Sequence, residues 1–374
     1  MTSKERVIAA IEGRETDVLP VHSSYNMLSN VDHWEELTGL PVWKYYEWML
    51  SSDRAWRREV YNQFFGTLAY DIVQPNYPDI SDDVEIVMQD NVPLFYNRKD
   101  GTYKPIPTNI HETGSGGGEK KIRYVFNKQD AKERLKLRKA EDLVAADNIS
   151  RFSLTDFKNQ FDDKFLMFGG LVNTFYGNVY HVGMENFYAM LIEEPDLIHY
   201  ISSLYLEQNI EQIRAWAKLG SDAVYIDDAT ATSDMISVKM YEEFSLPYLL
   251  PQVKEIQRLG MKAFVIYFGG ISDRVEQIAS TGADVLMMEA SMKGFINDYA
   301  SIAKRLKGKM CLAGNLNPYT DIEITTDEEL EARMTAMAKA GREYGKFFHC
   351  TGSPLTPNTT ISRIKKFIEL GHSL

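Results

Sequence analysis

The chain has 374 residues, of which 44% are hydrophobic, and 53 acidic against 41 basic residues give a net charge of -12. This length and apolar content suffice for a large buried core. The acidic balance excludes a general affinity for nucleic acid or for anionic membrane surfaces, because like charges repel. Two cysteines exclude a disulfide framework, no apolar run is long enough to span a membrane, and the first residues form an amphipathic pattern, unlike a signal peptide. We therefore expect a cytoplasmic protein with neither nucleic acid nor membrane as partner.

Eight short apolar runs recur along the chain, and each ends in glycine or polar residues. Such runs are typical of buried parallel strands. They read VLPVHSS, YDIVQPN, KFLMFGGLV, DAVYIDD, KAFVIYFGG, ADVLMMEA, KMCLAGNL and KFFHCTGS. Helical patterns lie between them, with Gly220 and Gly260 at helix C-cap positions. Eight strands alternating with helices predict an α/β fold, a single (β/α)8 TIM barrel over residues 1–374 that begins with a helical segment.

The segment from about residue 81 to residue 147 interrupts this alternation and predicts an insertion. Its stretch EIVMQDNVPLFYNRKDGTYKPIP alternates like an antiparallel hairpin with Asp100 and Gly101 as the turn. A glycine run from Gly114 to Gly118 follows, which is either a hinge for a lid or a surface loop. It is not a phosphate-binding loop, because no GK[ST] follows it.

Polar and aromatic side chains gather where the predicted strands end. In a parallel barrel these carboxyl ends carry the chemistry, because the loops there vary without disturbing the core. An aspartate pair at a strand end can bind a metal, act as an acid or cap a loop, and the aromatic residues either line a slot for a flat ring or pack in the core. The candidates, in chain order, are His22, Tyr25, Gln74, Asn76, Asn173, Tyr176, Tyr180, His181, Asp227, Asp228, Tyr267, Phe268, Glu289, Asn315 and Cys350.

Four segments resemble the uroporphyrinogen decarboxylase superfamily: ERVIAAIEGRETDVLPV, GSDAVYIDDATATSDMISVKMYEEFSLPYLLP, TGADVLMMEA and AGNLNP. The resemblance extends over most of the chain and is weakest in the insertion. It implies a single (β/α)8 barrel, in agreement with the alternation of strands and helices. One branch of this superfamily removes carboxylates from a porphyrinogen, and another transfers methyl groups with cobalamin or a corrinoid protein.

One motif disfavours the decarboxylase branch, and a second limits the reactions expected of the methyltransferase branch. The decarboxylases carry an arginine-rich segment after the first strand that holds their substrate's carboxylates, whereas this chain has VHSSYNMLSN, without arginine. The methyltransferases commonly bind zinc through His-x-Cys at the fifth strand and a cysteine at the eighth. Here Ile266 and Phe268 occupy the first two positions, and only Cys350 matches the third. The missing pair argues against coenzyme M or homocysteine as methyl acceptor, because those reactions need zinc to activate a thiol.

A rebuilt zinc site is implied by a further resemblance, to the substrate:corrinoid-protein methyltransferases of anaerobic O-demethylase systems. These are thought to use an acidic residue followed by two cysteines, and Glu289, Cys311 and Cys350 resemble that order, with Asp284 less well placed than Glu289. Cys311 has an alternative role as a buried core residue, which we favour because its strand position lies deep in the barrel.

The resemblance therefore implies a methyltransferase that moves a methyl group from a small methoxylated aromatic donor to Co(I) of a separate corrinoid protein. Asp228, Glu289 and Cys350 are the expected catalytic residues, and zinc is the expected metal. A uroporphyrinogen-type decarboxylase, a methyltransferase with another donor or acceptor, and a catalytically silent binding protein remain as alternatives. The sequence leaves the oligomeric state open, a homodimer included.

Overall fold

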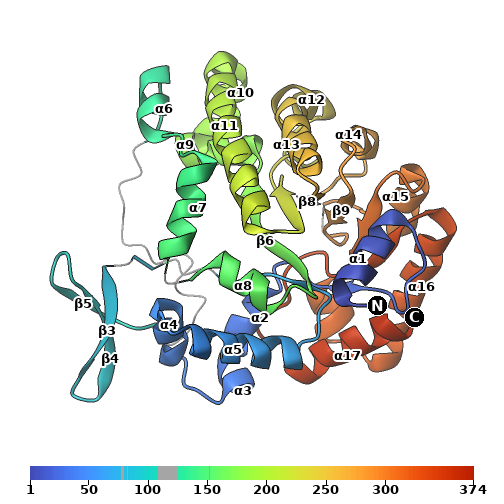
Figure 1. Cartoon of the computed structure of the whole chain (residues 1–374). Helices are drawn as coiled ribbons and strands as arrows, with labels where there is room; N and C mark the ends of the chain where they lie inside the picture. The colour runs from blue at the N-terminus through green and yellow to red at the C-terminus, as the bar shows by residue number, and fades with distance from the viewer. Residues whose placement is uncertain (77–79, 82, 108–123, 151, 293) are drawn as a thin grey trace.

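The alternating strands and helices close into a barrel in the computed structural model, which describes residues 1–76, 80–81, 83–107, 124–150, 152–292 and 294–374 (Figure 1). Within these residues, one sheet of eight parallel strands has the order β1-β11-β10-β9-β8-β7-β6-β2. This sheet confirms the predicted (β/α)8 fold. Its strands are β1 (Val21–His22), β2 (Ile72–Val73), β6 (Phe165–Val172), β7 (Ala223–Asp227), β8 (Lys262–Tyr267), β9 (Val285–Met288), β10 (Cys311–Ala313) and β11 (Phe347–Cys350).

The barrel seam lies between β1 and β2, where a buried carboxylate joins the two strands. The backbone N–H of Asp71 donates to the carbonyl of Val21 over 3.1 Å, and the N–H of Val21 donates to Asp71 Oδ2 over 2.9 Å. Arg6 donates to Asp71 Oδ1 over 2.6 Å, and His372 Nε2 lies 2.9 Å from Oδ2. Asp71 thus connects both strands to the first and last helices.

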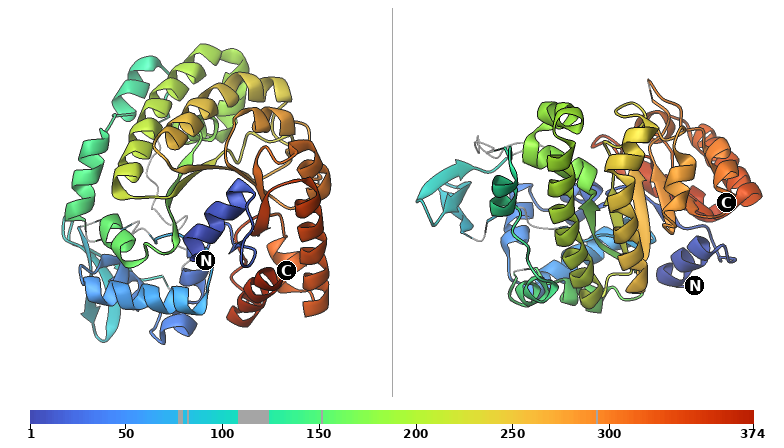
Figure 2. Two further views of the ribbon diagram at one scale, coloured as in Figure 1. Left: turned by 45° about the vertical axis from the view of Figure 1, so that its right-hand side comes forward. Right: turned by 90° about the horizontal axis from the view of Figure 1, so that it is seen from above.

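Helices surround the sheet, as the two views in Figure 2 show. Between β1 and β2 and at the start of the chain lie α1 (Ser3–Glu12), α2 (Met27–Asp32), α3 (Trp34–Thr38), α4 (Trp43–Leu50) and α5 (Arg54–Thr67). The remaining helices are α6 (Lys128–Arg134), α7 (Ala140–Ile149), α8 (Leu154–Gln160), α9 (Thr174–Val182), α10 (Met184–Glu193), α11 (Pro195–Leu219), α12 (Val238–Phe244), α13 (Leu246–Arg258), α14 (Val275–Ser280), α15 (Tyr299–Leu306), the π-helix η2 (Pro318–Glu323), α16 (Asp327–Tyr344) and α17 (Ile361–Ser373). None of the described helices is long and apolar enough to cross a membrane.

Side chains alternate between two hydrophobic clusters on either side of the strands. The inner cluster fills the barrel and includes Phe264, Ile266, Met287 and Cys311. Val7 and Ile11 of α1 also belong to it, so this helix closes the end of the barrel where the strands begin (Figure 2). The outer cluster lies between the strands and the helices that cover them. Membership in one cluster or the other therefore tells which way each strand residue faces.

The insertion forms a small antiparallel sheet that projects from one side of the barrel (Figure 1). Its strands are β3 (Val84–Gln89), β4 (Val92–Asn97) and β5 (Thr102–Pro105), and β4 pairs with both neighbours. The predicted hairpin corresponds to β4 and β5, with Gly101 at a φ of 70° in the turn. The alternating pattern in the sequence predicted two strands here and did not identify β3 as a third one. The glycine run from Gly114 to Gly118 lies outside the described residues.

Candidate active site

The strand register brings five predicted site residues to one level of the barrel mouth. His22 is the direct partner of Cys350. On β10, Ala313 is level with Phe348 of β11 and with Met287 of β9. Two residues further along each chain segment, Asn315 is therefore level with Cys350 and with Glu289. Met288 is level with Tyr267, which makes Phe268 the neighbour of Glu289. These positions are the last residues of their strands or come shortly after them, where a parallel barrel places its chemistry.

Tyr25 and Asp227 meet across this mouth. The Tyr25 hydroxyl donates to Asp227 Oδ2 over 2.7 Å, and the backbone N–H of Ala229 donates to Oδ1 over 2.9 Å. Tyr25 has a φ of 51°, in the left-handed region that side-chain-bearing residues seldom adopt. Backbone strain of this kind persists where surrounding contacts hold it, and it clusters at functional sites. The hydrogen bond to Asp227 is one such contact.

Three aromatic rings form a wall beside this pair. The Tyr25 ring lies 5.4 Å from that of Tyr225 in an edge-to-face arrangement and 5.8 Å from that of Phe268. All three rings pack against the inner cluster and are only partly buried. Tyr225 was not among the predicted site residues, although it stands two positions before Asp227 and so faces the same side of β7.

Burial controls the protonation of the groups around Asp227. It raises the pKa of Asp227, and the hydrogen bonds from Tyr25 and Ala229 offset part of that effect. The pKa of Tyr25 is also raised by burial and by Tyr225 and Asp227, so its hydroxyl keeps the proton that it donates. Burial, Tyr176 and Asp227 raise the pKa of Tyr180 as well, and the rings of Tyr176 and Tyr180 lie 5.2 Å apart. Tyr180 is therefore within electrostatic reach of Asp227, and Tyr176 packs beside Tyr180.

Glu289 is a half-buried carboxyl group at the same mouth. Burial is the main cause that raises its pKa, and Asp234 adds to the effect. Its backbone carbonyl accepts from Asn297 Nδ2 over 3.0 Å and from Asn315 Nδ2 over 3.1 Å. Asn315, which we predicted to contact substrate, therefore uses its amide to fix the end of β9. A carboxyl group with a raised pKa can serve as a proton donor.

Asp228 and Asn173 lie on the opposite side of the barrel wall. Asn173 Nδ2 donates to Asp228 Oδ1 over 3.0 Å, and Ser245 Oγ donates to Oδ2 over 2.6 Å. Gln252 of α13 donates to Asn173 Oδ1 over 2.8 Å. Burial raises the pKa of Asp228 to about 6. The predicted catalytic and substrate roles of Asp228 and Asn173 thus fall on fully buried side chains that join the sheet to its helices, because neighbours in a strand face opposite ways.

The same alternation separates Tyr267 from Phe268. Phe268 faces the barrel, whereas Tyr267 belongs to the outer cluster, and its hydroxyl lies 2.8 Å from that of Tyr241 on α12. The two residues therefore do not form one ring slot, in contrast to the expectation from the sequence. Tyr25 and Tyr225 take the place that Tyr267 was expected to fill.

The two predicted histidines are buried and uncharged at neutral pH. Burial lowers the pKa of His22 to about 3 and that of His181 to about 4. Among the described residues, neither ring nitrogen of His181 has a hydrogen-bond partner, and the same holds for Nδ1 of His22. His22 is level with Cys350 at the mouth, whereas His181 packs on Tyr205 of α11, with 5.5 Å between the ring centroids.

The predicted zinc ligands Glu289, Cys311 and Cys350 do not converge. Cys311 is level with Val285, four residues before Glu289, and four residues of strand span about 13 Å. Both thiols are fully buried, and burial raises their pKa, in Cys350 to about 12. Within the described part of the chain, no group of three His, Cys, Asp or Glu side chains is arranged to hold a metal. These residues therefore do not fit the expected zinc site.

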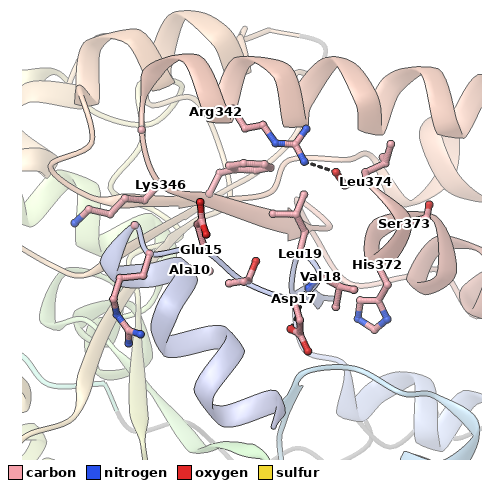
Figure 3. A pocket seen from close by; sticks show the side chains of 15 residues that line it. Ala10, Glu15, Asp17, Val18, Leu19, Arg342, Lys346, His372, Ser373 and Leu374 are labelled. Atoms are coloured by element: carbon pink, nitrogen blue, oxygen red, sulfur yellow. Dashed lines mark hydrogen bonds between the residues drawn. The ribbon is translucent and has the colours of Figure 1, made fainter. Parts of the chain in front are cut away.

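A cavity of about 490 Å³ lies at the other end of the barrel, where the strands begin (Figure 3). The turn from Gly13 to Leu19, the start of β11 and the C-terminal helix line it. Arg342 donates to the Leu374 carbonyl there, and Lys346 lies nearby. This end of a barrel contributes to stability rather than to chemistry. We therefore place the candidate active site at the opposite mouth, beside Tyr25, Asp227 and Glu289.

The sequence profile of the family described as "Uroporphyrinogen decarboxylase (URO-D)" matches residues 122–374. The chain belongs to the uroporphyrinogen decarboxylase family. The family match begins in the insertion and covers six of the eight barrel strands, β6 to β11. The arginine-free loop after β1 lies outside the matched range.

Uroporphyrinogen decarboxylase of Coxiella burnetii is 27% identical to this chain over 187 residues, or 48% of each sequence. The enzyme of Chlorobaculum parvum is 28% identical over 168 residues, which cover 44% of this chain and 43% of the relative. The chain thus matches less than half the length of these relatives. A methyltransferase from Methanosarcina mazei matches in structure with a TM-score of 0.66 and 16% identity, over 100% of this chain and 99% of that one. At this identity, the similarity shows a shared fold.

Proposed function

We propose that this member of the uroporphyrinogen decarboxylase family is a methyltransferase that takes the methyl group of a small methoxylated aromatic compound and passes it to a separate corrinoid protein. The observation that carries the proposal is the mouth itself: Tyr25, Tyr225 and Phe268 form an aromatic wall beside the raised-pKa carboxyl group of Glu289. A flat apolar ring fits against such a wall, and its ether oxygen needs a proton when the methyl group leaves.

Glu289 is the proton donor in this proposal. The corrinoid on the partner protein would supply the nucleophile for the methyl carbon. The bond between methyl carbon and oxygen breaks with its electron pair on oxygen, and the proton of Glu289 goes to that oxygen. A free phenol leaves, and Glu289 remains as a carboxylate. A pKa raised by burial favours the protonated form that this step requires.

Tyr25 and Asp227 orient the aromatic wall. The carboxylate of Asp227 holds the Tyr25 hydroxyl, which fixes the ring that packs on both Tyr225 and Phe268. Cys350 remains a neutral thiol because burial raises its pKa to about 12, so we give it a packing role at the mouth. No step is assigned to zinc, since the expected ligands do not fit a metal site.

Exposed apolar side chains in the segments that follow the strands support docking of a partner over the mouth. Met235 follows β7, Met292 and Ile296 follow β9, and Tyr319 follows β10, with exposed fractions of 42%, 51%, 72% and 51%. Apolar groups that remain in water beside an active site are typical of a protein-binding surface. A corrinoid protein that docks there would face Glu289 and the aromatic wall.

Decarboxylation of a porphyrinogen is the second candidate, because the relatives that match in sequence are named uroporphyrinogen decarboxylases. The barrel mouth argues against it. The loop VHSSYNMLSN after the first strand has no arginine. Several substrate carboxylates would then enter an acidic barrel without counter-charges, which weakens binding.

The test is direct. The protein is mixed with a reduced corrinoid protein and a panel of methoxylated aromatics, methylamines and methylthiols, and the formation of methyl-Co(III) is followed in the visible spectrum. Methyl transfer from an aryl ether with release of free phenol supports the proposal. Transfer only from an amine or thiol overturns the donor class. Decarboxylation of a porphyrinogen on the order of once per second overturns the reaction.

Two matched variants test the roles of the carboxyl groups. Glu289→Gln and Asp228→Asn each replace a carboxyl group that has a raised pKa by an amide that cannot donate an acidic proton. Both groups lie at strand ends, but only Glu289 faces the mouth. We expect Glu289→Gln to lower the rate of methyl transfer by roughly 10²- to 10⁴-fold. Asp228→Asn should lower it by a much smaller factor. Equal losses in the two variants would contradict the assignment of Glu289 as the proton donor.

A further inference from the structure

A lateral pocket of about 580 Å³ opens between the barrel wall and three helices on its outside. Strand β6 and the residues Gln74 and Pro75, which follow β2, form one side of it, and residues of α7, α8 and α11 form the other. Figure 1 labels β6 and these three helices. Its lining is mainly apolar and includes Met167, Phe168, Trp216 and Tyr225. Met167 belongs to the inner cluster, whereas Phe168 and Trp216 belong to the outer one. The pocket therefore reaches through the wall of the barrel.

The gap in the wall follows from a short ladder and a glycine pair. Strands β2 and β6 pair only from Ile72 to Val73, so the rest of β6 has no ladder partner on that side among the described residues. Pairing of β6 with β7 is irregular between Met167 and Gly170. A glycine pair in a strand marks a bulge or a close approach of other groups. The wall is thus open beside Gly169 and Gly170.

Both glycines are required by aromatic rings that press on the strand. A Cβ atom on Gly169 would lie 2.5 Å from the Trp216 ring, and one on Gly170 would lie 1.8 Å from the Tyr225 ring. Trp216 approaches from the helix side, and Tyr225 approaches from inside the barrel. The glycine pair therefore lies between the two rings, and the inner ring, Tyr225, also packs against Tyr25 of the aromatic wall.

One polar atom in this apolar pocket lacks a partner. Gln74 is 2% exposed, and its Oε1 has no hydrogen bond within the described residues. Its Nε2 makes only a long contact of 3.7 Å to Met167 Sδ. A buried carbonyl oxygen without a donor destabilises the empty pocket, so a ligand that supplies a donor gains from filling it. Asp147 also lines the pocket, but its oxygens accept hydrogen bonds from Ser153, Leu154 and Thr155.

We propose that the lateral pocket binds a monocyclic aromatic alcohol, with the ring against the apolar lining of the pocket and the hydroxyl group donating to Gln74 Oε1. The apolar lining recognises the ring, and the buried, unpartnered oxygen of Gln74 recognises one hydroxyl proton. This inference concerns binding and stands apart from methyl transfer. A phenol is also the class of product released in the proposed reaction, so the two proposals are compatible and separately testable.

The experiment compares phenol with toluene, which matches it in size but has no hydroxyl donor. Dissociation constants are measured by ligand-observed NMR for the wild-type chain, Gln74→Leu and Ala215→Leu. Gln74→Leu removes the acceptor, and Ala215→Leu narrows the pocket from α11. We expect Gln74→Leu to weaken phenol binding roughly fivefold to tenfold, the factor that loss of one neutral hydrogen bond gives, and to leave toluene binding unchanged or tighter.

Ala217→Leu is the matched control for Ala215→Leu, since Ala217 lies on the same helix but does not line the pocket. Ala215→Leu should weaken both ligands, and Ala217→Leu should weaken neither. Circular dichroism melts show whether each variant is folded, and Gln74→Leu tests the proposal even if Ala215→Leu does not fold. The proposal is overturned if phenol fails to bind the wild type, or binds wild type and Gln74→Leu equally. Because no corrinoid is present, failure here leaves the methyltransferase proposal untouched.

Discussion

Tyr25 and Asp227 connect opposite parts of the barrel through a hydrogen bond of 2.7 Å between their side chains. Tyr25 follows the first barrel strand, and Asp227 ends the fourth. The bond crosses the barrel mouth and holds Tyr25 at a φ of 51°. A single contact therefore couples the geometry of the β1 loop to the protonation of a buried carboxyl group.

Tyr25→Phe removes this bond and leaves Asp227 Oδ2 without its donor. We expect a loss of about 1–3 kcal/mol in the free energy of unfolding at pH 8, the cost of a buried acceptor left unsatisfied. The bond lowers the pKa of Asp227, so its loss raises that pKa further, and the destabilisation should shrink at pH 4, where Asp227 is more protonated. Urea titrations at both pH values measure this. Tyr319→Phe, at a tyrosine that is 51% exposed, is the control and should change little.

Asp228 makes stability depend on pH in the opposite sense from an exposed ion pair. Its pKa is raised from 3.8 to about 6 by burial, so its contribution to stability is complete below about pH 4 and is lost as the pH rises through 6. Asp228→Asn keeps the hydrogen bonds to Asn173 and Ser245 possible and removes the charge. The wild type loses this contribution as the pH rises and the variant does not. The free energy of unfolding of the variant should therefore rise relative to that of the wild type from pH 4 to pH 6, and the difference should then level off. A difference that is flat from pH 4 to pH 8 would contradict the raised pKa.

Cys311→Ala tests packing against metal binding. Cys311 is fully buried in the inner cluster, so the variant should lose roughly 1 kcal/mol in the free energy of unfolding through the cavity that it leaves. Metal analysis should give the same content for variant and wild type after mild purification. A folded variant that has lost one equivalent of zinc would restore the ligand role implied by the sequence resemblance.

Asp71→Asn should open the barrel seam. The carboxylate is 1% exposed and has a lowered pKa because bonds from His372, Val21 and Arg6 outweigh the effect of burial. Its contribution is therefore present at neutral pH and is lost as the pH falls through the folded-state pKa. We expect a loss of roughly 3 kcal/mol at pH 7 and a smaller loss at pH 3. Asp17→Asn removes the more exposed partner of Arg6 and should cost less than about 1 kcal/mol.

Gly352→Ala tests how closely the ends of β9 and β11 approach each other. An added Cβ atom would lie 2.4 Å from the backbone nitrogen of Ala290, which cannot rotate away. We expect a loss of about 1–3 kcal/mol and a lower methyl-transfer rate, because Glu289 moves with its neighbour. Gly66→Ala in α5 meets no atom within 4 Å and should stabilise the chain by about 0.5–1 kcal/mol. Thermal unfolding of both variants checks the contrast.

The strands could be predicted from the sequence because a parallel strand buried on both faces appears as a short apolar run with a polar end. That same property hides which face of the strand points inward. From the sequence, Asp227 and Asp228 are equally plausible as the residue that points into the barrel, and so are Tyr267 and Phe268. The reason is that the preceding residues of each strand are apolar on both faces. Only the register with neighbouring strands decides between them. Tyr225 follows from Asp227 by period two once that choice is made.

Other features left little trace in the sequence. The seam at Asp71 joins residues 65 and 301 positions away, and no local pattern reports such distances. The lateral pocket has one local signal, the pair Gly169 and Gly170 within an apolar strand, which indicates a bulge. The rings that need these glycines come from β7 and α11, so the pocket itself could be found only in three dimensions.

The pairing of β1 with β11 has a consequence for synthesis of the chain. Val21 finds its ladder partner in His349, which the ribosome adds more than three hundred residues later. Throughout translation, β1 therefore presents an open strand edge, a feature that promotes pairing with other chains. The strand has only two residues and follows Pro20, which cannot donate a backbone hydrogen bond, so the exposed edge is short and poorly suited to aggregation.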